Sequence, residues 1–162
     1  MMLDNLLKAH KKIGVSACLA GEICRYNGEY SGDKTIEKLV TTGKIFPFCP
    51  EVLSELPTPR EPAEIRHGDG IDVWQNESKV VTLQGLDVTD KFKNGALNAL
   101  KLLKNQKISV VILKENSPSC GSHTIYDGTF SGAKKKGIGV AAALFLENEI
   151  TVYSSSAIAL IP

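Results

Sequence analysis

The most informative stretch of this sequence is Ile108-Ser-Val-Val-Ile-Leu-Lys-Glu-Asn-Ser-Pro-Ser-Cys120. Its first six residues, 108–113, form an almost continuous run of apolar and β-branched side chains. Such a run is typical of a central strand in a parallel sheet, where both faces of the strand are buried. The run leads directly into a polar Ser-Pro-Ser turn that ends at Cys120, so a thiol follows the end of a predicted central strand.

Two further cysteines occupy the same kind of position. Cys18 follows the apolar run 13–17, and Cys49 follows the run 44–48; both runs are predicted to be strands. Because the strands of one parallel sheet end at a common edge, we expect Cys18, Cys49 and Cys120 to converge there. Three convergent thiolates suit a soft metal centre with one open coordination position, and an open position is typical of a catalytic site.

Strand and helix patterns alternate along the chain. Apolar runs predict strands over 13–17, 44–48, 108–113 and 150–153. Helical periodicity and capping residues predict helices over 33–41, 91–105 and 140–148. This alternation predicts an α/β fold in one domain spanning residues 1–162, with an open, mostly parallel sheet of the Rossmann-like or flavodoxin-like kind and helices on both faces.

The segments between these elements carry weaker signals. Alternating apolar residues from Ile71 to Leu83 predict a β-hairpin insertion that turns over residues 75–77. Three prolines at positions 57, 59 and 62 predict an irregular surface loop, and residues 121–139 are predicted to be a glycine-rich loop.

Composition and charge exclude several classes of function. The chain has 162 residues, an ordinary apolar fraction of 43%, and a net charge of +1, so charge gives no reason to expect a nucleic-acid or membrane partner. There is no apolar stretch of membrane-spanning length and no signal-peptide pattern, which predicts a cytoplasmic protein. Thiols stay reduced in the cytoplasm, so four cysteines there point to a metal, a cluster or redox chemistry, or to unrelated buried thiols.

Residues near the three thiols offer acid–base groups. The spacing lacks a C-x-x-C motif, so the fold itself has to assemble any site. Glu51 lies two residues after Cys49 and could shuttle a proton, although a loop carboxylate can equally cap nearby N–H groups. Ser117 and Ser119 precede Cys120, where serines are also common as turn residues.

Long motifs of the chain resemble a known family. They are G-V-S-A-C-L-A-G-E-I-C-R-Y-N-G around Cys18, F-C-P-E-V-L around Cys49, L-P-T-P-R-E-P-A-E-I, L-K-E-N-S-P-S-C-G around Cys120, and I-Y-D-G-T-F-S-G-A-K-K-K-G-I-G-V. From Ile13 to Tyr153 the chain is similar to the small bacterial family of single-domain proteins that includes the thiouracil desulfidases.

The resemblance implies a cofactor and an activity. The cofactor is a 4Fe-4S cluster held by three cysteines with its fourth iron free, and it can be lost from an aerobically prepared protein. The implied activity is a non-redox desulfidase that takes a small thiolated base such as 2-thiouracil and releases uracil and sulfide. By position, the resemblance assigns the cluster to Cys18, Cys49 and Cys120 and the catalytic roles to Glu51 and Ser117.

A second hypothesis belongs to another functional class. If Cys18, Cys24, Cys49 and Cys120 all bound a zinc ion or a cluster, the closed site would be structural, as four-ligand zinc sites usually are. The protein would then be a non-catalytic binding or sensing protein. The number of subunits does not follow from the sequence under either hypothesis.

Overall fold

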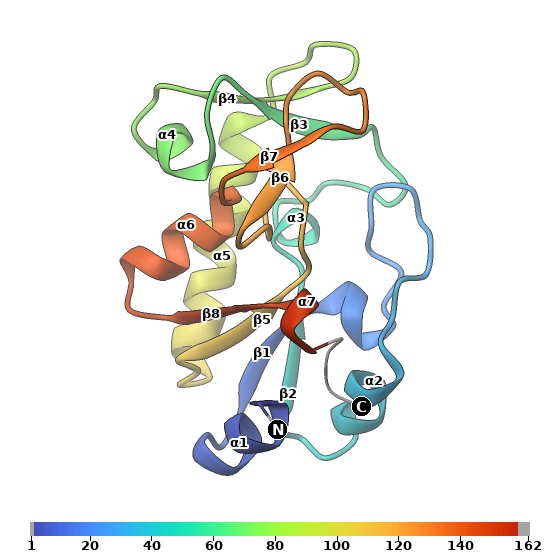
Figure 1. The fold of residues 1–162 in the computed structure, drawn as a ribbon, viewed down its shortest axis with the longest axis vertical. Helices are drawn as coiled ribbons and strands as arrows, with labels where there is room; N and C mark the ends of the chain where they lie inside the picture. Colours follow the sequence, from blue (N-terminus) through green and yellow to red (C-terminus); the bar gives the residue numbers. More distant parts are fainter. Residues whose placement is uncertain (1, 159–162) are drawn as a thin grey trace.

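A four-stranded parallel sheet forms the centre of the protein in a computed structural model that describes residues 2–158 (Figure 1). The strands lie in the order β2-β1-β5-β8 and every neighbouring pair is parallel. Their bounds are β1 (Ile13–Ser16), β2 (Ile45–Phe48), β5 (Val110–Leu113) and β8 (Thr151–Ser154). All residues of β1 and β5 are buried, which agrees with the prediction that the run 108–113 supplies a central strand.

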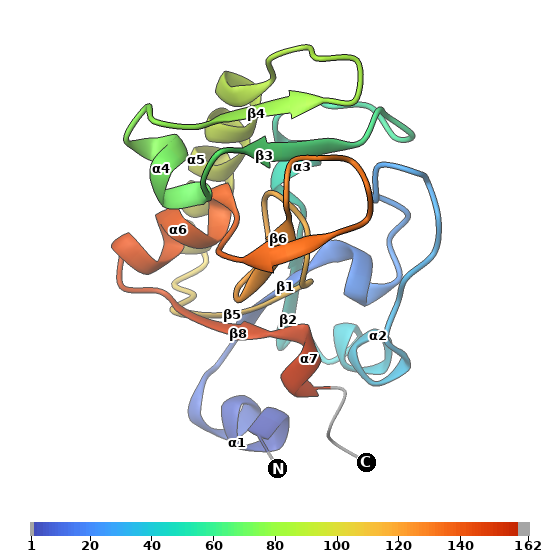
Figure 2. The ribbon, with the colours of Figure 1, turned by 45° about the horizontal axis from the view of Figure 1, so that its top comes forward.

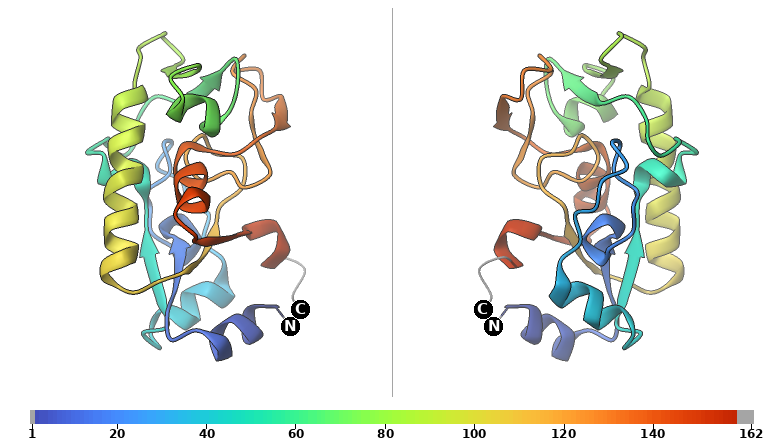
Figure 3. Two further views of the ribbon diagram at one scale, coloured as in Figure 1. Left: turned by 90° about the vertical axis from the view of Figure 1, so that its left-hand side faces the viewer. Right: turned by 90° about the vertical axis from the view of Figure 1, so that its right-hand side faces the viewer.

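Helices cover both faces of this sheet (Figure 3). One apolar core lies under α5 (Thr89–Asn105), α6 (Val140–Glu147) and the short α3 (Pro50–Leu53), where Phe92, Leu103 and Phe145 are buried. A second core lies under α1 (Met2–Ala9) and α2 (Lys34–Val40) on the opposite face, where Leu6 and Ile36 are buried. The predicted α/β fold with helices on both faces is therefore confirmed.

Gly14 in β1 lets the long helix approach the sheet closely. A Cβ atom built at this position would lie 2.9 Å from both Leu103 Cδ2 and Val111 Cγ1. Leu103 belongs to α5 and Val111 to the neighbouring strand β5, so a larger residue would push the helix away from the middle of the sheet.

Two small antiparallel hairpins lie above the carboxyl ends of the central strands, and we call them the roof (Figure 2). The first pairs β3 (Ala63–Arg66) with β4 (Lys79–Thr82), with the short helix α4 (Gly70–Trp74) between them. The second pairs β6 (Thr124–Tyr126) with β7 (Lys134–Lys136). The remaining short elements are η1 (Ala17–Ala20) after β1 and α7 (Ser155–Ile158) after β8.

The predicted hairpin over 71–83 was wrong in its partner strand. Residues 71–74 belong to α4, and β4 pairs with residues 63–66, which lie before the predicted hairpin. The physical reason is a capping box: the Asp69 carboxylate accepts from Ile71 N at 3.0 Å, while Asp69 N donates to the Asp72 carboxylate at 2.9 Å. This pair of bonds starts a helix where apolar alternation alone favoured a strand.

Other segments were also more ordered than predicted. The expected glycine-rich loop contains the β6–β7 hairpin, and the N-terminal residues form α1, for which no prediction was made. Within residues 2–158, none of the helices is both long and apolar enough to cross a membrane.

Candidate active site

A cavity of about 540 Å³ lies between the carboxyl edge of the central sheet and the roof, because residues of both line it. All four cysteines line it, together with Glu51 and Ser117, so the fold brings every residue singled out from the sequence into one place. None of the four cysteines forms a disulfide.

Three of the four thiols owe their positions to the end of a strand. Cys18 lies in η1 directly after β1, and Cys49 is the N-cap residue of α3 directly after β2. Cys120 ends the turn after β5, where its N–H donates a 2.7 Å hydrogen bond to Ser117 Oγ. Cys24 comes from the loop after η1 and is buried beside them.

The environment favours the thiolate form at two of these positions. The pKa of Cys18 is lowered to about 7, chiefly through the neighbouring Cys24 thiol; burial opposes this effect, and the charges of Lys114 and Arg25 add to it. A hydrogen bond from Cys24 also lowers the pKa of Cys49. Cys24 keeps its proton, since its hydrogen bonds to Cys18 and Cys49 raise its own pKa. Cys24 therefore favours its protonated form beside two thiols that favour the thiolate.

Cys120 differs from the other two proposed ligands. Burial raises its pKa, and the negative charges of Cys49 and Cys18 add to this effect. A bound metal reverses that preference, because a coordinating thiol loses its proton to the metal's charge. Three thiols that repel one another as anions therefore fit a site in which positive iron compensates their charge.

Glu51, Ser119 and Ser117 form a chain of polar contacts along one wall of the cavity. Ser119 Oγ donates a 2.7 Å hydrogen bond to Glu51 Oε2. The hydroxyls of Ser119 and Ser117 lie 3.3 Å apart. Ser119 also lies 3.7 Å from the sulfur of Cys120, so the carboxylate connects through one hydroxyl to both Ser117 and a thiol.

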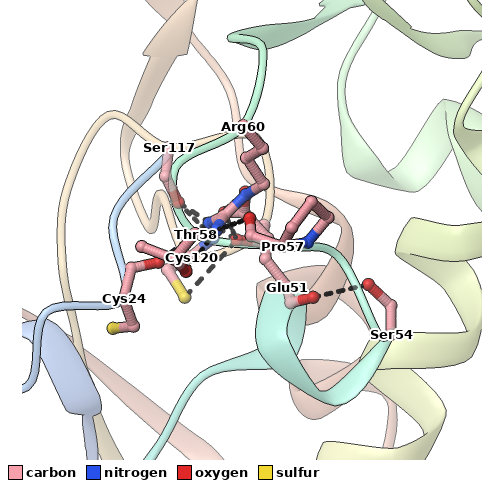
Figure 4. A network of polar contacts seen from close by, with 9 residues as sticks. Cys24, Glu51, Ser54, Pro57, Thr58, Arg60, Ser117 and Cys120 are labelled. Carbon is pink, nitrogen blue, oxygen red and sulfur yellow. Dashed lines mark hydrogen bonds and ion pairs between the residues drawn. The ribbon is translucent and has the colours of Figure 1, made fainter. Parts of the chain in front are cut away.

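Arg60 holds the other oxygen of Glu51 (Figure 4). Its Nε and Nη2 lie 3.2 and 3.0 Å from Glu51 Oε1, in a fork that only guanidinium offers. Nη2 also donates to the carbonyl of Cys24 at 3.0 Å. The side chains of Arg60 and Glu51 are only 7% and 14% exposed, so this ion pair is largely buried.

The sequence assigned no functional role to two of these residues, Ser119 and Arg60. Ser119 was named beside Ser117 but was given no role; it is the serine that contacts Glu51 directly, whereas Ser117 contacts Ser119 and the backbone of Cys120. Arg60 lies in the segment predicted as an irregular surface loop. Its one signal in the sequence was its place in the motif L-P-T-P-R-E, which the family resemblance includes.

A single metal ion needs its ligands closer together than a cluster does. Within residues 2–158, no three histidine, cysteine, aspartate or glutamate side chains are close enough to hold one metal ion. The sulfur ligands of a cubane are farther apart than those of one zinc ion, because each binds a different iron. As the structure places them, the four cysteines therefore do not form a single-ion zinc site.

A family model described as 2-thiouracil desulfurase matches residues 13–157. The chain belongs to this family. It is also 44% identical to the solved structure of the 4Fe-4S-dependent thiouracil desulfidase TudS (DUF523Vcz), with a TM-score of 0.80 over 93% of this chain and 98% of that one. A relative from Bacillus subtilis (strain 168), the uncharacterized protein YbbK, is 50% identical over 142 residues, which are 88% of this chain and 94% of the relative.

The family model covers residues 13–157, close to the range 13–153 over which the sequence motifs resemble the family, and its description names the same removal of sulfur from 2-thiouracil. The likeness to TudS extends to the whole fold, because the TM-score is high and both chains are covered almost completely. It therefore supports the 4Fe-4S cofactor that the convergence of three thiols suggests.

Proposed function

We propose that the protein is a 4Fe-4S-dependent desulfidase that hydrolyses the C=S group of a small thiolated base such as 2-thiouracil. In this reaction the thiocarbonyl and one water become a carbonyl and hydrogen sulfide, with no net transfer of electrons. One observation carries the proposal: the thiols of Cys18, Cys49 and Cys120 share a cavity with the Glu51 carboxylate, in a chain of the 2-thiouracil desulfurase family.

In this proposal Cys18, Cys49 and Cys120 hold the cluster. When bound, a cubane with three protein ligands supplies one open iron, a Lewis acid suited to a thiocarbonyl sulfur. Cys24 remains a thiol beside the cluster, because its pKa is raised, and can donate its S–H to a neighbouring sulfur.

Glu51 is the proposed acid–base group. It takes a proton from water that attacks the thiocarbonyl carbon and returns a proton to the product. Ser117 lies next in the chain of hydroxyls and serves proton transfer at the thiol side of the cavity. Arg60 and Ser119 each hold one oxygen of Glu51, so the carboxylate is oriented before the substrate arrives.

We also propose that residues 1–162 act as one domain in the cytoplasm, on a free small molecule and not on nucleic acid or a membrane. A net charge of +1 and four cysteines without disulfides support this.

An anaerobic assay of sulfide release tests the proposed function. Protein reconstituted with iron and sulfide is incubated with 2-thiouracil, other thiolated bases and simple thioamides, and both sulfide and the oxygenated product are measured. We expect stoichiometric sulfide and uracil from 2-thiouracil, and none from apoprotein. The alternative of a structural centre would be supported by a colourless protein with stoichiometric zinc, or by a clustered protein that releases no sulfide from any compound.

A further inference from the structure

The roof of the cavity carries a buried carboxylate to which the proposed reaction gives no role. Glu64 lies in the middle of β3, is only 7% exposed, and lines the same cavity as the four thiols. Its neighbour Ile65 is fully buried in the core under α5. Because successive side chains of a strand point to opposite faces, Glu64 faces away from that core and toward the cavity.

One oxygen of Glu64 is occupied by backbone. Oε1 accepts hydrogen bonds from Gly128 N at 2.9 Å and Phe130 N at 3.1 Å. The loop lies close to the strand here: Gly128 has φ of +93°, and a Cβ atom built on it would be 2.7 Å from the carbonyl of Ile65. The carboxylate is therefore fixed in position by the loop it orders.

The other oxygen is left free. Oε2 has no hydrogen-bond partner among the residues that the structure describes. It retains some accessible surface, because among those residues only Ser31 Oγ is a side-chain oxygen or nitrogen that is both unpaired and fully buried. A carboxylate whose residue is only 7% exposed, which is held by two backbone N–H groups and lines the cavity, is suited to receive an N–H group of a ligand.

Aromatic rings complete this wall of the cavity. Phe130, whose own N–H donates to Glu64, and Tyr126, which ends β6, both line the cavity. Lys134 Nζ lies 5.9 Å from the centre of the Tyr126 ring, on the partner strand β7. Flat conjugated rings stack on such side chains, whereas the carboxylate beside them recognises polar groups on the ring edge.

We propose that Glu64 is a specificity-determining residue that accepts a hydrogen bond from a ring N–H of the substrate. The inference rests on the proposed desulfidase function and narrows its substrate class to thiolated compounds with at least one free N–H. The thiols lie on loops that end the central strands, and Glu64 lies in the roof above them, so a ring with sulfur toward the thiols can present its N–H edge to Glu64. A compound alkylated at every ring nitrogen leaves this buried acceptor without a partner, which costs affinity.

Binding of sulfur-free rings tests the inference apart from turnover. Uracil has two N–H groups and 1,3-dimethyluracil has none, so their affinities for the reconstituted protein are compared by calorimetry. In Glu64→Gln the amide oxygen can keep the two loop hydrogen bonds while an NH2 group replaces the free acceptor. We expect uracil to bind the variant about tenfold to a hundredfold more weakly, the scale of losing one hydrogen bond to a charged group, and 1,3-dimethyluracil to change little.

Glu61→Gln is the matched control, because Glu61 lies three residues earlier and does not line this cavity. It should bind both rings as the unmodified protein does. An unchanged ratio of the two affinities in Glu64→Gln would overturn the inference. If Glu64→Gln fails to fold, Glu64→Asp is tested instead; it retracts the carboxylate by one methylene and should weaken the binding of uracil but not of 1,3-dimethyluracil. Equal binding of the two rings by the unmodified protein would also overturn the inference.

Sulfide release separates this failure from failure of the proposed function. If the unmodified protein releases sulfide from 2-thiouracil but Glu64→Gln does so with the same kcat/KM, only the role of Glu64 is wrong. If the clustered protein releases sulfide from none of the thiolated compounds, the proposed function itself is wrong.

Discussion

The hydroxyl of Ser119 donates a 2.7 Å hydrogen bond to Oε2 of Glu51, a residue 68 positions earlier in the chain. This bond joins the turn after β5 to the helix after β2, and it brings the proposed acid–base group against the turn that ends in Cys120. Ser119 is therefore the serine that directly orients the Glu51 carboxylate.

Ser119→Ala should lower kcat roughly tenfold to a hundredfold while iron content stays normal, because Glu51 loses one of the two partners that orient its carboxylate. Turnover of 2-thiouracil and iron content are measured on the same reconstituted sample. Ser54→Ala is the control: Ser54 donates to the backbone carbonyl of Glu51 at 2.6 Å and not to its carboxylate. Equal turnover in the two variants would contradict the positioning role.

Glu51→Gln should reduce turnover by ~100-fold or more, since an amide cannot take up the proton of the attacking water. Cluster content, followed by visible absorption and iron analysis, should remain near that of the unmodified protein because Glu51 is not a proposed ligand. Undiminished sulfide release by this variant would remove Glu51 from the mechanism.

Arg60→Met should destabilise the protein by about 3 kcal/mol, because it leaves the Glu51 carboxylate without its cation in a largely buried place. Urea unfolding of the reduced protein measures this loss. The double variant Arg60→Met with Glu51→Gln should recover part of it, since the unpaired charge is then absent.

The exposed ion pair of Lys79 and Asp87 provides the control for Arg60. Its side chains are 72% and 50% exposed and the charged atoms are 3.8 Å apart. Lys79→Met should therefore change stability by less than about 1 kcal/mol. If Arg60→Met lowers the free energy of unfolding by no more than Lys79→Met does, the buried ion pair stabilises the protein no more than an exposed one.

Cys24→Ser should keep near-normal iron and measurable activity, whereas Cys18→Ser should lose both. The reason is that the proposed chemistry needs one iron without a protein ligand, and the raised pKa of Cys24 favours the thiol over the thiolate that a ligand requires. Iron and sulfide are assayed after anaerobic reconstitution of each variant. Equal loss of iron in both would make Cys24 a fourth ligand and would favour the closed structural site.

Glu115→Gln should make stability less dependent on pH in the acid range. Burial of Glu115 opposes its charged form, but hydrogen bonds from Ser154, from the backbone of Thr124 and His123 and from Ser122 together outweigh it and lower its pKa to about 2. The unfolded chain titrates near 4.3, so the charged group stabilises the fold above that pH and loses this effect as the pH falls toward 2.

Thermal unfolding from pH 7 to pH 3 measures this effect. The unmodified protein should be more stable than Glu115→Gln at pH 7, and the difference should shrink steadily below pH ~4.3. A difference that stays constant down to pH 3 would show that the carboxylate charge does not matter to the fold.

Local patterns predicted the parts of the fold that a strand or helix determines by itself. The apolar run 108–113 contains the buried strand β5, and the Asp33 cap correctly marks the start of α2, where its carboxylate accepts from Thr35 N and Ile36 N. The strand 63–66 was not recognised, because four residues that follow a proline-rich segment are too few to show a periodic pattern. This strand depends instead on its pairing with residues 79–82.

The sequence by itself determined that three thiols follow strand ends, and parallel strands ending at one edge made their convergence predictable. Only the tertiary structure decided which polar groups meet there. Arg60 reaches Glu51 and the carbonyl of Cys24, Ser119 reaches Glu51, and Glu64 reaches the loop at 128–130, over separations of 9, 36, 68, 64 and 66 residues. Residue periodicity reports which side of an element is buried, whereas these contacts depend on where loops and hairpins pack, and no local pattern records that.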